Sequence, residues 1–250
     1  MDALKRTLIE KEGNENGWEL VVKSTESEVM LASARHRAQV RVTQPQKSWL
    51  VKVPTGLICQ ELTRTFPDAF QKESTFMAVD RDHLALLLRR TAELALSLPD
   101  QAALTYANRV EKEIAKIQDC TTEVECLVKQ RIGQDTFREA LMAYWGRSCS
   151  VTGLNLSEVL RASHAKPWTK CESDEERLDV FNGLLLCANL DALFDRGLIT
   201  FDACGHIVCS SCITPEQQSM LHIQDTMTLR WVAPEHAPYL AWHRDHVFVA

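Results

Sequence analysis

The spacing of hydrophobic residues predicts an antiparallel sheet in the first part of the chain, with helices beside it. Four short runs place hydrophobic residues at alternate positions, a period typical of strands with one buried face. These runs cover residues 18–23, 29–34, 38–43 and 49–53. Because short polar segments join the runs, we expect neighbouring runs to pair as a meander. Hydrophobic residues at helical spacing predict helices over residues 1–11, 55–65, 80–98 and 102–118.

The second part of the chain has mainly helical spacing. A long helix is expected over residues 122–145, and a break near Gly133 is left open. The segments that follow predict a hairpin over 198–202 and 206–210, a helix over 215–221 and a strand over 227–232. We place a domain boundary near residue 120, which gives an N-terminal recognition or regulatory domain over 1–120 and a second domain over 121–250. The predicted fold class is α+β.

Residues 161–201 contain the polar residues that carry chemistry. Pro167 disfavours helical geometry for the residue before it, so His164 is expected at a strand end or in a loop. Asp191 and Asp195 are four residues apart in a helical segment, which places two carboxylates on one helix face. Two like charges repel there unless a cation lies between them, and Mg²⁺ or Mn²⁺ prefers such oxygen ligands.

Each of these features also has an ordinary structural interpretation. A histidine before a proline is usually a surface or core residue. Asp195 precedes Arg196 and Gly197, a sequence typical of a helix C-terminus, and Asn182-Gly183 is typical of a hairpin turn. Taken singly, these interpretations are favoured; taken as an ordered set, the residues favour a catalytic site.

The ordered set reads SHxxPW from Ser163, NGLxL from Asn182 and DxxFDxG from Asp191. It resembles the HNH endonucleases, and the resemblance extends over residues 131–250. It implies a ββα-metal fold, a hairpin packed on one helix, with extra helices and a further hairpin in the 121–250 domain. His164 matches the general base and Asn182 the residue that orients the loop. Asp191 and Asp195 match metal ligands, as does Ser163, although many relatives carry a stronger ligand, Asp or His, at that position.

The cofactor implied is one Mg²⁺ or Mn²⁺ ion. Many HNH relatives also hold a structural zinc with two CxxC pairs, but here Thr152 and Leu190 stand where the second cysteine of each pair would be, so this zinc is not expected. Cys209 and Cys212 form one CxxC, with Cys204 and His206 nearby. This group resembles a metal-binding cluster. Because there is no second CxxC, the favoured interpretation is that these are small residues around a tight hairpin.

The partner implied by the resemblance is DNA. The sequence predicts contacts with nucleic acid at Lys166, Trp168, Lys170, Arg196, Arg35, Arg37 and Arg41. The last three belong to the span from Val29 to Gln60, which contains no acidic residue, and we expect them on one face of a strand. A solvated outer face, or a surface that docks an acidic protein, would show the same pattern.

Composition narrows the class of protein only slightly. The net charge of −6 argues against a protein that coats nucleic acid non-specifically, but it allows a nuclease with an acidic metal site. The first twelve residues lack an apolar signal core and no apolar run is long enough for a membrane span, so we expect a cytoplasmic protein with reduced cysteines.

Three functions remain open from the sequence. The first is a DNA endonuclease, the second an RNA-directed nuclease with the same site, and the third a binding module with a decayed site. A stand-alone HNH nuclease with an unfamiliar sensing domain looks similar to effectors of bacterial restriction and anti-phage systems, such as the nuclease of Zorya-type operons. Other defence-system proteins are then possible partners, and the oligomeric state is open.

Overall fold

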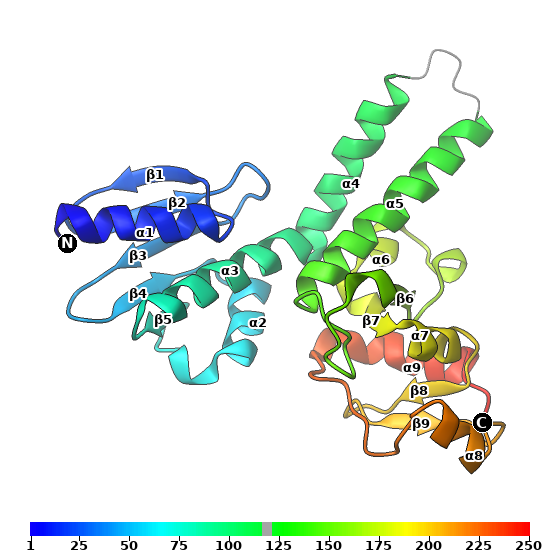
Figure 1. Cartoon of the computed structure of the whole chain (residues 1–250). Coiled ribbons are helices and arrows are strands. Elements are labelled where there is room, and N and C mark those ends of the chain that lie inside the picture. The colour runs from blue at the N-terminus through cyan, green and yellow to red at the C-terminus, as the bar shows by residue number, and fades with distance from the viewer. Residues whose placement is uncertain (117–121) are drawn as a thin grey trace. The chain divides into compact units, whose positions relative to one another are not determined.

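The computed structural model describes residues 1–116 and 122–250, which group into two compact units (Figure 1). The first unit covers residues 1–101 and the second covers 102–250. Along the sequence, the boundary between the units lies after residue 101 and not near residue 120, because the helix that starts at Pro99 belongs mostly to the second unit. The end of the helix expected over 102–118 lies partly outside the described residues.

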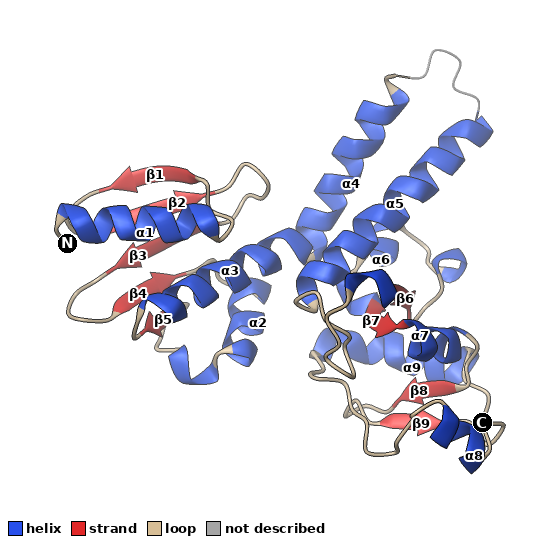
Figure 2. Cartoon of the chain, in the orientation of Figure 1, coloured by secondary structure: helices blue, strands red, loops and turns tan. Residues whose placement is uncertain are grey.

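The first unit is a five-stranded antiparallel sheet accompanied by helices (Figure 2). Its strands lie in chain order, as predicted for a meander. The strands are β1 (Leu20–Ser24), β2 (Glu28–Ala32), β3 (Gln39–Thr43), β4 (Trp49–Lys52) and β5 (Thr75–Ala78). The helical segments are α1 (Ala3–Glu15), α2 (Leu57–Thr65), η1 (Pro67–Ala69) and α3 (Arg81–Ser97).

Alternate residues of the central strands form the core of this unit. Val29, Leu31, Val40 and Val42 are at most 1% exposed, while the residues between them face outward or are half-buried. Helix α3 packs buried leucines into this unit. Asp80 caps its N-terminus, where the carboxylate accepts a hydrogen bond from the His83 amide. The α+β class of the prediction is confirmed.

Three details of the first unit differ from the prediction. The sequence does not predict strand β5, because a segment of four residues is too short to show the alternation of buried and exposed positions. Leu4, one of the hydrophobic residues at helical spacing that predict the first helix to bury one face, is 80% exposed. Arg35 and Arg37 lie in the loop before β3, so only Arg41 of the three arginines is on the strand. The expectation that the three share one strand face is therefore wrong.

The second unit contains helices, two pairs of short antiparallel strands and several single turns of 3₁₀ helix. Its helices are α4 (Pro99–Ile114), α5 (Thr122–Tyr144), α6 (Asp174–Leu178), α7 (Ala188–Asp195), α8 (Pro215–Met220) and α9 (Ala237–His246). Its strands are β6 (Leu160–His164), β7 (Gly183–Cys187), β8 (Ile199–Phe201) and β9 (Ile207–Cys209). The 3₁₀ turns are η2 (Ser157–Val159), η3 (Trp168–Lys170), η4 (Val180–Asn182) and η5 (Pro234–His236).

Two expectations for the second unit need comment. Helix α5 continues through Gly133 without a break. The strand expected over 227–232 is wrong, because this segment forms only an isolated bridge between Thr228 and His206. None of the helices in the described ranges is long and apolar enough to cross a membrane.

A hairpin and a helix form the part of the second unit that positions the predicted site. Strands β6 and β7 pair in antiparallel register from Leu160 with Cys187 to His164 with Gly183. Helix α7 follows β7 directly and packs against β6. This is the ββα arrangement that the resemblance implied, and the eighteen residues from 165 to 182 form the connection between its strands.

Candidate active site

His164 is the last residue of β6, and its ring is held on two sides. Its Nε2 lies 2.9 Å from the carbonyl oxygen of Arg177. Because a carbonyl can only accept, Nε2 of the neutral ring carries the hydrogen and Nδ1 keeps its lone pair. The ring stacks on Phe137 with the centroids 3.7 Å apart. Burial lowers the pKa of His164 to about 4, so the ring is neutral and able to accept a proton at physiological pH.

Asn182 is fully buried and ties together the two ends of the 165–182 connection. Its Oδ1 accepts from the Lys166 amide at 2.8 Å, and its Nδ2 lies 3.2 Å from the carbonyl oxygens of Lys166 and Glu176. The Ala165 amide donates to the Asn182 carbonyl at 2.9 Å. These bonds fix the backbone on both sides of His164, since Arg177, which follows Glu176, supplies the carbonyl that holds the ring.

Asp191 and Asp195 project from α7 beside Ser163. The Ser163 hydroxyl, almost fully buried, donates to Asp191 Oδ1 at 2.5 Å. Desolvation, and secondly the charge of Asp191, raise the pKa of Asp195 to about 6. The Asp195 side chain is nevertheless exposed by surface area. Desolvation and exposure of the same carboxylate are compatible if Asp195 borders a concave surface. There, neighbouring atoms exclude part of the water around the carboxylate while one side stays open to solvent.

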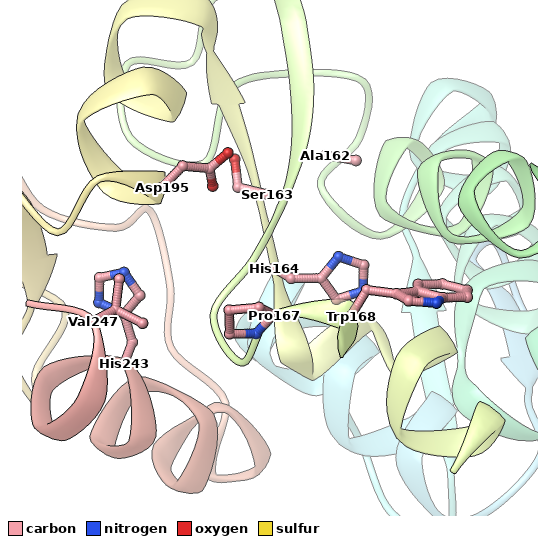
Figure 3. Close-up of a pocket in the computed structure, with 8 residues that line it drawn as sticks. All are labelled: Ala162, Ser163, His164, Pro167, Trp168, Asp195, His243 and Val247. Carbon is pink, nitrogen blue, oxygen red and sulfur yellow. The ribbon is translucent and has the colours of Figure 1, made fainter. Parts of the chain in front are cut away.

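Such a surface is present as a pocket of about 320 Å³. In Figure 3, Asp195 and Ser163 point toward one another, with His164 and Trp168 on one side and His243 and Val247 on the other. Ala162 and Pro167 complete the lining. The pocket thus joins a neutral histidine and carboxylate and hydroxyl oxygens in one concave space.

His243, to which the sequence assigned no role, fixes the wall of the pocket. Its ring stacks on Phe194 at 3.8 Å, and Nε2 donates to the Phe194 carbonyl at 3.0 Å. Its Nδ1 therefore accepts from the Thr200 hydroxyl at 2.9 Å. Burial lowers the pKa of His243 to about 4. With both nitrogens engaged, this histidine is a structural link between α9, α7 and β8.

Helix α5 supplies parts of the site that sequence analysis missed. Phe137 stacks on His164, and Gly133 leaves room for Trp168: a Cβ at Gly133 would approach the Trp168 indole to 2.3 Å. Trp168 in turn lies edge-on to His164 at 5.8 Å between centroids. The spacing of Gly133 and Phe137, four residues apart on a helix, was the available signal, but it carries no motif by itself.

The cations predicted to bind nucleic acid differ in their freedom to do so. Lys166 Nζ lies 2.6 Å from Glu176, and its side chain is only 14% exposed. Trp168 packs against α5 and lies under the guanidinium of Arg177, at 5.7 Å from the ring centroid. Lys170 and Arg196 are exposed, although one Arg196 nitrogen donates to the Ala192 carbonyl. Lys170 and Arg196 are therefore the more accessible of these residues.

In the first unit the predicted arginine set is dispersed. Arg41 lies 3.1 Å from Glu28 of the neighbouring strand, which also binds Lys23 at 2.7 Å. The strand β2 therefore brings an acidic residue beside a segment that has none in its own sequence. Arg35 and Arg37 are exposed on the loop before β3.

Two groups of cysteines in the second unit bear on metal binding. Cys149 and Cys187 stand where HNH relatives have the first cysteine of each zinc-binding CxxC pair, and both are buried. The Thr152 amide donates to Cys149 Sγ at 3.4 Å. Cys204 lies near Asp202 and His206, with all three potential ligand atoms within 4.8 Å of one another. Among the described residues, a search for three or more His, Cys, Asp or Glu side chains close enough to hold a metal ion finds this group. It lies on a different element from Asp191 and Asp195.

Comparison with known proteins assigns a family to the core of this unit. Residues 149–202 match the family described as HNH endonuclease. The match includes β6, β7 and α7 with His164, Asn182, Asp191 and Asp195, but neither α5 nor α9. The match supports a nuclease domain in this segment and implies that it binds nucleic acid. A search of curated proteins finds no match to the chain.

Proposed function

We propose, on the premise that residues 149–202 form an HNH endonuclease domain, that the chain is a metal-dependent endonuclease that hydrolyses phosphodiester bonds of DNA. One observation carries the proposal. The Nε2 of His164 is occupied by a carbonyl while the ring lines a pocket that also contains the carboxylate of Asp195 and the hydroxyl of Ser163. A base of fixed tautomer beside an oxygen-rich surface is what hydrolysis of a phosphodiester requires.

His164 is the general base of this proposal. Its Nδ1 accepts a proton from a water molecule as the water oxygen forms a bond to phosphorus. The bond from phosphorus to the 3′ oxygen breaks, and that oxygen takes a proton from solvent. Phe137 and the Arg177 carbonyl keep the ring from turning, so Nδ1 needs no reorientation during the reaction.

The residues that would hold the metal ion are Asp191 and Asp195. Their donor set consists of carboxylate oxygens, which fits Mg²⁺ or Mn²⁺ better than Zn²⁺. When bound, the ion supplies positive charge that stabilises the leaving oxygen. The raised pKa of Asp195 agrees with this assignment: burial is its largest cause, and the charge of Asp191, which a bound cation would offset, is the second. Ser163 was expected as a ligand; its hydroxyl donates to Asp191, a contact that supports a role in orienting this carboxylate.

The substrate-contacting residues proposed are Lys170 and Arg196, with Trp168 of the pocket lining and Lys166, two residues before it in the chain. Phosphate oxygens would have to replace Glu176 as the partner of Lys166. Arg35, Arg37 and Arg41 remain a second proposed contact, in which the loop before β3 contributes two of the three charges.

Cleavage of supercoiled plasmid DNA and of a matched single-stranded RNA tests the proposal directly. We expect nicking of the plasmid with Mg²⁺ or Mn²⁺, none with EDTA, and slower cutting of RNA. Faster cutting of RNA would establish the RNA-directed alternative. Absence of cutting on both substrates at saturating metal would leave the decayed binding module as the explanation.

The proposed setting, a cytoplasmic effector of bacterial restriction or anti-phage defence, rests on the sequence resemblance alone. Phage plaque counts on cells that express the chain with its neighbouring genes, compared with cells that express the His164→Ala variant, test it. Equal plaque counts in the two strains would reject a defence role.

A further inference from the structure

The turn between β8 and β9 gathers three side chains of different ligand type. Asp202, Cys204 and His206 occupy alternate positions of this turn, and their carboxylate oxygen, sulfur and ring nitrogen all lie within 4.8 Å of one another. Cys204 and His206 are exposed, so an ion can reach them from solvent. The hydrolytic mechanism proposed above uses none of the three.

The turn is held in shape before any ion binds. Asp202 Oδ1 accepts from the amides of Cys204 at 2.8 Å and His206 at 2.9 Å. Its other oxygen, Oδ2, lies 3.3 Å from His206 Nδ1. Oδ2 and Nδ1 therefore already face each other.

Neighbouring backbone supports the turn from outside. Gly205 has φ +86°, the left-handed region that glycine adopts without strain. The Leu229 amide donates to the Gly205 carbonyl at 2.8 Å, and the Ile207 amide donates to the Met227 carbonyl at 3.0 Å. The ligands are thus attached to a turn that neighbouring backbone holds on its C-terminal side and that the Asp202 amide closes by donating to the His206 carbonyl, which reduces the conformational entropy lost when an ion is bound.

The chemistry of the three ligands selects the class of ion. A thiolate and an imidazole bind borderline-soft ions such as Zn²⁺, whereas Mg²⁺ prefers oxygen ligands alone. We propose that Asp202, Cys204 and His206 bind one Zn²⁺ ion or a similar borderline-soft divalent ion, with a water molecule as the fourth ligand. This site is separate from the pair Asp191 and Asp195. Binding displaces the proton of the Cys204 thiol into solvent, and His206 stays neutral.

An ion bound there would join the end of β8 to the start of β9. The same stretch of β8 anchors α9, because the Thr200 hydroxyl binds His243 and the Phe201 carbonyl accepts from Arg244 at 2.8 Å. Zn²⁺ should therefore raise the melting temperature of the protein, since an ion that binds only the folded state stabilises it by mass action.

Co²⁺ titration of the chelator-treated full chain, in excess Mg²⁺, tests the proposal by absorption spectroscopy. We expect one equivalent of Co²⁺ to produce a thiolate-to-cobalt charge-transfer band, which Zn²⁺ then removes by displacement. The Cys204→Ser variant should lose the band, and His206→Gln should weaken binding at least tenfold. The matched control is Cys212→Ser, which removes another exposed cysteine of the same region and should keep the band.

The outcomes separate this site from the proposed nuclease site. An Asp195→Asn variant should lose cleavage but keep the cobalt band and the rise in melting temperature with Zn²⁺. No charge-transfer band in the unmodified chain, or a band that survives in Cys204→Ser, would overturn the proposal. So would a band that disappears equally in Cys212→Ser.

Discussion

The predicted nuclease site and the basic surface of the first unit differ in how their charged and polar residues are held. At the nuclease site, Asn182 is fully buried, and Ser163 and His164 each have a defined hydrogen-bond partner. On the first unit, Arg41 is 49% exposed and shares Glu28 with Lys23, while Arg35 and Arg37 lie on a loop. The proposed catalytic residues are each held by several partners, and their set forms a motif in the sequence. Phosphate contact needs only exposed charge, which leaves no motif.

The largest expected effect comes from the base. His164→Ala should reduce nicking by a factor on the order of 10² to 10⁴, because His243, the other histidine of the pocket, has both ring nitrogens engaged in hydrogen bonds. Its melting temperature should change little. The matched control is His83→Ala, an exposed histidine of the first unit, which should nick at the parental rate. Parental nicking by His164→Ala would show that His164 is not the base.

A smaller effect is expected from the helix outside the matched segment. Phe137→Leu removes the ring that stacks on His164 and should lower kcat about tenfold with KM unchanged, since the base is less well oriented. The control is Phe76→Leu, a fully buried phenylalanine of the first unit. Both variants should lose comparable thermal stability, but only Phe137→Leu should lose kcat. Equal kcat in the two variants would limit α5 to a structural role.

The pH dependence of Asp195 gives a further test. Its pKa is raised to about 6 in the folded protein, so folding favours its protonated form. This contribution to stability is present below the unfolded pKa, near 3.8, and is lost as pH rises through about 6. In EDTA, Asp195→Asn should therefore melt higher than the parent at pH 7 and equally at pH 3.5. The difference should be small because the side chain is exposed. Calorimetry at both pH values measures it, and a lower melting temperature for the variant at pH 7 would contradict the carboxylate pair.

The smallest effect on cleavage should come from the first unit. Changing Arg35, Arg37 and Arg41 to Gln should flatten the slope of log affinity against log salt by roughly three units, if each neutralises one phosphate. Cleavage at saturating DNA should be unchanged. The binding titration uses His164→Ala protein with and without the three changes. An unchanged slope would remove DNA binding from this surface and favour a protein partner.

What could be predicted from the sequence follows the range of the interactions involved. The spacing of Asp191 and Asp195 and the restriction imposed by Pro167 are local signals. The structure agrees with both, because Asp191 and Asp195 lie on one helix, α7, and His164 is the last residue of β6. The contacts of Phe137 and Arg177 with His164 join residues far apart or in separate elements, and neither residue type is distinctive alone. Glu28 likewise reaches Arg41 only through strand pairing. Strand β5 was missed because four residues show too few repeats of a period of two.

The hydrogen bonds of Asn182 have a consequence for local stability. They make the orientation of His164 a property of the closed 165–182 connection, because the carbonyl that holds the ring belongs to this connection and not to β7. Opening of this segment would free the imidazole while the β6–β7 ladder stays paired, at a free-energy cost below that of global unfolding. We therefore expect nuclease activity to be lost at a lower urea concentration than the far-ultraviolet circular dichroism signal, which reports global unfolding. The amides of Ala165 and Lys166, both bonded to Asn182, should exchange with solvent deuterium sooner than those of β6.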